Sequence, residues 1–362
     1  MKREQTEKIK AFAVLVIFWY HLFGCGSYLT LPENIWLPVI SEKFALSLCA
    51  GPICLHVFMF CSGYGLYRSY ICRKTGMRDF LRRFTKILIP YWTVLALTIL
   101  YLVLRGKFNP EHIFVNLFAL VHDDDMLYAT FSWFVKLYLE LPFVLLLVQK
   151  IEKRGSRSFL KDFFLYIVLP VAIWTSLYPL MLAVQGNARM LFLVVSLQEL
   201  FFYLPDFFTA MLCAKYGVFE KIREKTAGIP GALQVLCSFL ILYAVIFIQA
   251  RQMLSQRVLL DWLQAFLMVC CLLCIMEKGK IHSRYILPFI GKNSLYYWLL
   301  SGLFFLNTSE LQFIIYAPRY TVLILIWQVI VETPLVIVVK WVAGKLMGAT
   351  DRIIDCSFRK KG

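Results

Sequence analysis

Charged residues are scarce in this chain, and most of those present carry one sign. Asp, Glu, Lys and Arg make up 17% of its 362 residues, against about a quarter in soluble domains. Hydrophobic residues make up 60% and recur in long runs along the whole length. This composition excludes an ordinary soluble domain. It predicts an all-α, polytopic membrane helix bundle, because a helix needs about 20 apolar residues to cross a bilayer.

Other signals are also missing. No internal repeat and no Gly/Ser/Pro-rich linker is visible, so we expect one membrane domain over residues 1–350 and a short basic cytoplasmic tail over 351–362. The first apolar run lacks a small-residue cleavage site and is expected to be a span rather than a signal peptide. Cys271 and Cys274 form a C-x-x-C without a second pair, and no metal-ligand spacing appears, so no metal is expected.

Ten apolar runs have close to the length of a membrane span. The sixth is short and is interrupted by Pro205. A further apolar segment, 112–121, is too short to span and is expected to lie on the outer surface or to re-enter. The ten predicted spans are 11–29, 45–67, 84–104, 131–149, 162–184, 199–214, 230–250, 258–276, 286–305 and 320–347.

The distribution of lysine and arginine predicts the orientation. With the N-terminus inside, the inside segments hold 28 of the 38 basic residues and the outside segments hold seven. Loops on the cytoplasmic side carry such an excess, so both termini are predicted to be cytoplasmic. The formal net charge of +16 is therefore a topology signal, and no nucleic acid partner is expected.

Lys10 and His21 lie at the two ends of the apolar stretch "KAFAVLVIFWYH". Eleven residues return a helix to within about 20° of its starting direction and advance it by about 16 Å. Both side chains therefore share one face, with Lys10 at the cytoplasmic edge and His21 near mid-membrane. Two readings stay open: a topology charge with a packed polar residue, or a functional pair, because ionisable residues in spans are costly and an imidazole is a suitable general base.

A second basic group precedes the third span in "DFLRRFTKILIPYW", residues 79–92. Arg83 and Lys86 are three residues apart and share a helix face. Two cations at this spacing can hold a phosphorylated ligand, although ordinary positive-inside charge explains them too.

Several stretches resemble the acyltransferase family 3 of integral-membrane acyltransferases. "KAFAVLVIFWYH" resembles the family's basic-x10-His signature, with Lys10 where arginine is usual. "VFMFCSGYGLYRSY" resembles its second span, and "RRFTKILIPYW" its R-x-x-R motif, with Lys86 as the second basic residue. "WFVKLYLELPFVLLL" resembles the Trp-led fourth span, and "IGKNSLYYWLL" a late G-x-x-S-L-x-x-Y span. The matches keep their order and cover nearly the whole chain.

This resemblance implies a ten-helix bundle in the plasma membrane, bacterial in origin, that moves an acyl group, commonly acetyl, from cytoplasmic acyl-CoA. The acceptor is a hydroxyl of an extracytoplasmic glycan or lipid-linked sugar. No permanently bound cofactor is implied, since acyl-CoA is a substrate. His21 becomes the candidate catalytic residue, and Lys10, Arg82, Arg83 and Lys86 become candidates for holding the CoA phosphates. The two lysines keep the charge of arginine but lose its bidentate fork.

Other polar residues in the predicted spans are weaker candidates. His56 is a second acid/base or a packed histidine, and Asp206 follows Pro205 where a broken helix can line a cavity. Lys136 and Glu140 are expected to neutralise each other at i, i+4. Gly63 and Gly65 are expected to permit close helix approach. Motif positions add Ser62, Trp133, Tyr138, Asn293 and Ser294. His112, His122 and Asp123–Asp125 could contact an acceptor or a metal outside, but a solvated outer loop is expected, since no metal-ligand spacing appears.

Two rival functions remain open. A transporter or flippase for a lipid-linked sugar or small anion could use His56, Lys136, Glu140 and Asp206 as a proton relay, although no repeated halves with matched broken helices are visible. A non-catalytic membrane scaffold would tolerate changes at Lys10, His21 and Arg83.

Overall fold

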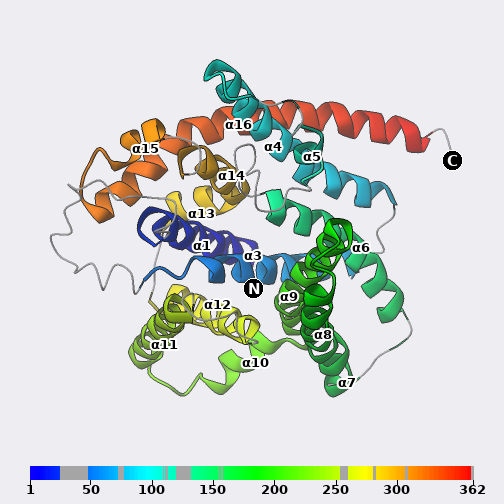
Figure 1. The fold of residues 1–362 in the computed structure, drawn as a ribbon. Coiled ribbons are helices and arrows are strands. Elements are labelled where there is room, and N and C mark those ends of the chain that lie inside the picture. Colours follow the sequence, from blue (N-terminus) through cyan, green and yellow to red (C-terminus); the bar gives the residue numbers. More distant parts are fainter. Residues whose placement is uncertain are drawn as a thin grey trace. The chain divides into compact units, whose positions relative to one another are not determined.

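The computed structural model describes residues 1–24, 48–71, 77–108, 110, 113–119, 132–153, 155, 158–252, 260–279, 283–305 and 309–359. These residues form helices and no β-strand, which confirms the all-α prediction (Figure 1). The elements are α1 (Arg3–Phe23), α3 (Gly51–Leu66), η1 (Tyr67–Ile71), α4 (Met77–Leu104), α5 (Ile113–Leu117), α6 (Ser132–Glu152), α7 (Phe159–Phe163), η3 (Phe164–Val168), α8 (Leu169–Ala183), α9 (Ala188–Tyr216), α10 (Val218–Lys225), α11 (Gly231–Gln252), α12 (Asp261–Lys278), α13 (Ile286–Lys292), α14 (Ser294–Phe305), α15 (Ser309–Tyr316) and α16 (Thr321–Arg359).

Five helical stretches of the described chain are long and apolar enough to cross a bilayer, as expected of a multi-pass membrane protein. They are Arg78–Leu104, Phe159–Ala183, Arg189–Tyr216, Gly231–Arg251 and Thr321–Ser357. Helices also occupy the other five predicted positions, as α1, α3, α6, α12 and the pair α13 and α14. The full count of ten spans and the cytoplasmic termini stay predictions.

The prediction of a short sixth span interrupted by Pro205 is wrong. Pro205 lies inside α9, which continues from Ala188 to Tyr216. Proline removes one backbone hydrogen bond, but helices in membranes tolerate it because neighbouring groups and small local adjustments satisfy the freed carbonyl. Asp206 therefore lies on a continuous helix rather than at a break.

The chain divides into two compact units, each described here by itself. The first comprises Met1–Cys25, Val39–Cys72 and Arg154–Ser294, and the second comprises Gly26–Pro38, Arg73–Lys153 and Leu295–Gly362. The first unit therefore contains α1, α3 and α7 to α13, and the second contains α4 to α6 and α14 to α16. The predicted domain over residues 1–350 and the predicted tail stay predictions.

Glycines allow the helices of the first unit to pack at backbone distance. A Cβ on Gly63 of α3 would lie 2.1 Å from the carbonyl oxygen of Phe207 in α9, and one on Gly291 of α13 would lie 1.6 Å from that of Glu7 in α1. Real side chains do not approach so closely, so only glycine fits. The expectation for Gly63 is confirmed. The expectation for Gly65 is wrong, because no described atom lies within 4 Å of its Cβ position.

In the second unit, α4 packs against α5, α6 and α16. Tyr91 Oη donates to the carbonyl of Asn116 at 2.6 Å, and Trp92 Nε1 donates to that of Leu117 at 2.8 Å, which fixes the short helix α5 to α4. At 1.5 Å per residue, the 39 residues of α16 extend about 58 Å, more than the hydrocarbon core of a bilayer. Residues 351–359 of the predicted tail belong to this helix.

Candidate functional site

Lys10 and His21 both lie on α1 of the first unit. Both side chains are half-buried, whereas the residues between them that face the core, including Ala13, Val14 and Ile17, are buried. The helix is continuous from Arg3 to Phe23, so the predicted geometry, one face and an axial separation of about 16 Å, holds.

Packing at the C-terminal end of α1 fixes the neighbourhood of His21. The Tyr20 ring lies against Gly51, where a Cβ would come within 2.1 Å of the ring, and Gly24 packs against Cys49. The rings of Tyr20 and His21 have their centroids 5.2 Å apart. The end of α1 is therefore held to the start of α3, and the imidazole is placed by this junction. At the other end, the Lys10 ammonium lies near the buried Cys61 thiol of α3.

The predicted donor residues Arg82, Arg83 and Lys86 lie on α4 of the second unit. Arg82 and Arg83 are half-buried and Lys86 is exposed. Pro90 follows inside the helix without ending it. The structure thus places Lys10 and His21 in the first unit, and the three basic residues of α4 in the second.

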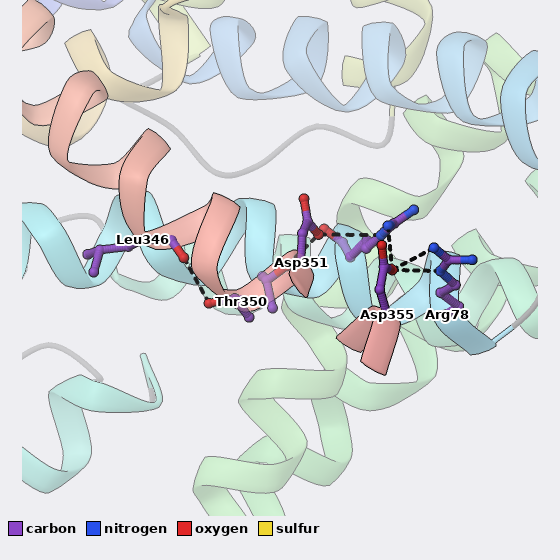
Figure 2. A network of polar contacts seen from close by, with 7 residues as sticks. Arg78, Leu346, Thr350, Asp351 and Asp355 are labelled. Atoms are coloured by element: carbon purple, nitrogen blue, oxygen red, sulfur yellow. Dashed lines mark hydrogen bonds and ion pairs between the residues drawn. The ribbon is translucent and has the colours of Figure 1, made fainter. Parts of the chain in front are cut away.

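Arg82 already has carboxylate partners within the second unit, Asp351 and Asp355, which are labelled in Figure 2. Its Nη2 lies 2.6 Å from Asp355 Oδ1, and its Nε lies 3.4 Å from Asp351 Oδ1. Arg78 lies one turn earlier on α4 and contacts the same Asp355 oxygen through Nη2 at 2.6 Å. Both aspartates come from the last turns of α16, so the end of this helix is ion-paired with the start of α4.

His56 takes part in a buried polar cluster of the first unit. Its Nδ1 lies 2.7 Å from Asp206 Oδ2 of α9, and its Nε2 lies 3.6 Å from Asp261 Oδ2 of α12. Gln249 of α11 donates to Asp261 Oδ1 at 2.6 Å. His56 and Asp206 are almost completely buried. The two residues of the proposed relay that lie in this unit are therefore in contact.

The remaining candidate residues lie on α3, α6 and α14, or outside the described residues. Ser62 Oγ donates to the carbonyl of Phe58 in its own helix at 2.9 Å, and Ser294 is buried at the start of α14. Trp133, Lys136, Tyr138 and Glu140 all lie on α6. Tyr138 is half-buried beside Phe134, with the ring centroids 5.0 Å apart. The positions His112, His122 and Asp123–Asp125 lie outside the described residues.

Two acidic residues with notable positions were not predicted. Asp261 contacts His56, but it begins α12 more than 200 positions along the chain, and no spacing connects the two. Glu332 of α16 is completely buried and accepts a hydrogen bond from Gln328 at 2.8 Å. Glu332 could have been found, since it is an acid inside a long apolar run.

The imidazole of His21 and the basic side chains at the start of α4 are each suited to a definite chemical role. A half-buried imidazole can accept a proton, and lysine and arginine at a helix start can hold phosphate. No group of three or more His, Cys, Asp or Glu side chains suited to a metal ion occurs in the described part of the chain.

Comparison with known proteins agrees with the sequence motifs. A family model described as an acyltransferase domain, Acyl_transf_3, matches residues 7–345. No curated protein and no solved structure matches the chain.

Proposed function

Because this chain belongs to acyltransferase family 3, we propose that it moves an acyl group, acetyl in the simplest case, from cytoplasmic acyl-CoA to a hydroxyl outside the membrane. The acceptor is an extracytoplasmic glycan or lipid-linked sugar, and the protein resides in a bacterial plasma membrane. The family match supports acyl transfer itself. The identities of the donor, acyl group and acceptor belong to the proposal.

The donor binds through its phosphates at the basic residues Lys10, Arg82, Arg83 and Lys86. Arginine and lysine form strong charge-assisted hydrogen bonds with phosphate oxygens. The pantetheine arm is slim enough to enter between helices and bring the thioester towards His21. The acyl-CoA is consumed as a substrate and is not a resident cofactor.

His21 carries the chemistry of this proposal. As a general base, its imidazole takes the proton of the acceptor hydroxyl while the oxygen attacks the thioester carbonyl. The carbon–sulfur bond then breaks, and the CoA thiolate takes the proton from the imidazolium, so the reaction is balanced without a net proton. Alternatively, the imidazole accepts the acyl group first and passes it on. The observation that supports either route is the shared α1 face of Lys10 and His21, about 16 Å apart along the helix.

Replacing the imidazole tests this assignment. We expect His21→Ala to lose about 100-fold or more of the transfer rate, the usual contribution of a general base, while membrane insertion and thermal stability are kept. The measurement is release of free thiol from acetyl-CoA by purified protein with a hydroxyl acceptor. Full activity of the His21→Ala protein would show that the imidazole has no catalytic role.

One observation favours the rival function of a proton-linked transporter: His56 and Asp206, two members of the expected relay, are hydrogen-bonded at 2.7 Å. The same assay separates the two functions. An acyltransferase releases free thiol from labelled acetyl-CoA, and a transporter does not.

A further inference from the structure

Two helices of the second unit face each other with matched charges. Arg78 and Arg82 are four residues apart on α4, and Asp351 and Asp355 are four residues apart on α16. Residues at this spacing lie on one helix face, one turn apart. The contacts join the two helices in opposite order along the chain. Arg78, the earlier arginine, contacts Asp355, the later aspartate, and Arg82 contacts both aspartates. We call these four residues the carboxylate clamp (Figure 2).

The clamp occupies cations that phosphate would otherwise bind. Arg78, Arg82, Arg83 and Lys86 are four cations at the start of α4, and Asp351 and Asp355 are ion-paired with two of them, Arg78 and Arg82. Lys86 lies one further turn along the same face as Arg82, and among the described residues no carboxylate is ion-paired with it. While the clamp is closed, the guanidinium groups of Arg78 and Arg82 are engaged by carboxylates, and a polyanion must displace these to bind both arginines.

The contacts of the clamp are also weak enough to be exchanged. The side chains of Arg78, Arg82, Asp351 and Asp355 are 27–46% exposed, and ion pairs at such positions contribute little to stability. Among the described residues the buried Nε–H of Arg82 has no hydrogen-bond partner, and Asp351 Oδ1 lies 3.4 Å from this nitrogen. A phosphate oxygen would satisfy this donor with better geometry and higher charge.

We propose that Asp351 and Asp355 are competitive carboxylates, which hold Arg78 and Arg82 at rest and are displaced when the phosphates of the acyl-CoA donor bind. This inference rests on the proposed function, since it concerns the donor site of that reaction. Asp351 and Asp355 then set the affinity for the donor without contacting the reacting atoms. The end of α16 moves away from the start of α4 on donor binding.

The first test is the double variant Asp351→Asn/Asp355→Asn in the full-length protein. We expect its KM for acetyl-CoA to fall about three- to tenfold with kcat unchanged, the range expected from losing weak ion pairs that compete with the ligand. The matched control is Asp79→Asn, which removes a negative charge from the same end of α4. In the described part of the chain Asp79 forms no ion pair with either arginine, so this variant should change KM less than twofold. An unchanged or raised KM in the double variant would refute the competition, because a purely structural clamp predicts that result.

A second measurement does not depend on the stability of the variant. Spin labels on Leu81→Cys and Ile353→Cys, both exposed positions, report the distance between α4 and the end of α16 in protein whose native cysteines, including the exposed Cys237 and Cys356, are replaced by serine. We expect saturating CoA to lengthen this distance, and an unchanged distance would overturn the displacement. If the unlabelled protein does not bind CoA at all, the proposed function itself fails. Binding of CoA with no effect of the aspartates removes only the clamp.

Discussion

Lys8 and Lys10, near the start of α1, allow a controlled test of the donor site, because the same lysine-to-alanine change can be made at a proposed donor residue and at a neighbouring lysine outside the site. Lys8 is paired with Glu4, Nζ to Oε1 at 2.8 Å, whereas Lys10 lies near Cys61 on the face that carries His21. We expect Lys10→Ala to raise the KM for acetyl-CoA about tenfold, the effect of losing a charge-assisted hydrogen bond. Lys8→Ala should change it less than twofold. Equal effects of the two variants would mean that only the overall charge matters.

Glu332 offers a second test at the scale of one residue. Its side chain is completely buried, and Gln328 supplies its hydrogen bond. Glu332→Gln keeps the shape and removes the cost of a buried acid, so we expect thermal stability to be kept or raised. Because ionisable residues inside spans default to function, we expect acyl transfer to fall about tenfold or more. A fully active Glu332→Gln protein would indicate that the acid only packs.

Local spacing was enough to predict some parts of these sites. The shared face of Lys10 and His21 follows from helix periodicity alone. The sequence suggests that His56 and Asp206 belong to one proton relay, but it does not predict their direct contact. It gives no indication of Asp261. Residues on three helices meet there, and the sequence contains no spacing that fixes such a meeting.

At the scale of helices, Gly63 and Gly65 form a matched pair on α3. A Cβ on Gly63 would collide with the backbone of Phe207, while one on Gly65 meets no described atom. Gly63→Ala should therefore lower the free energy of unfolding by about 1–3 kcal/mol through overpacking. Gly65→Ala should leave it unchanged or raise it by up to about 1 kcal/mol, since alanine favours the helix. Thermal unfolding in detergent measures both. Similar losses in the two variants would contradict this packing.

The positions of helices were more predictable than their ends. Long apolar runs gave a helix at each expected span, because every backbone group in a membrane needs an internal partner. Pro205 gave a wrong prediction for α9, since a break was expected at this proline and the helix continues through it. The extension of α16 to Arg359 was also missed. The last turns of α16 carry charged residues and are held to α4 by ion pairs, and these pairs cannot be read from hydropathy.

For the whole molecule, the division into two units was not visible in the sequence. The second unit combines Arg73–Lys153 with Leu295–Gly362, segments that are separated by most of the first unit. No linker marks this division, because each unit assembles from distant parts of the chain. The family match covers both units. His21 belongs to the first unit, and the basic residues of α4 belong to the second.

The orientation of the whole chain is the remaining test at this scale. Positive charge concentrates in alternate loops, so both termini should be cytoplasmic. A fluorescent reporter fused after Gly362, active only in the cytoplasm, should therefore fluoresce. An exported phosphatase fused after Lys107 should be active, because that segment is predicted outside.

The same arrangement has a consequence for the donor. If the start of α4 faces the cytoplasm, then Arg83 and Lys86 meet acyl-CoA where it is made. In protein whose native cysteines are replaced by serine, a membrane-impermeant thiol reagent added from outside should then not label Arg83→Cys in intact cells. Labelling should appear only after the membrane is opened. Two results would contradict this orientation: activity of an exported phosphatase fused after Gly362, and labelling of Arg83→Cys from outside. Either result would place the basic residues on the wrong side for a cytoplasmic donor and would remove the physical basis of the phosphate site.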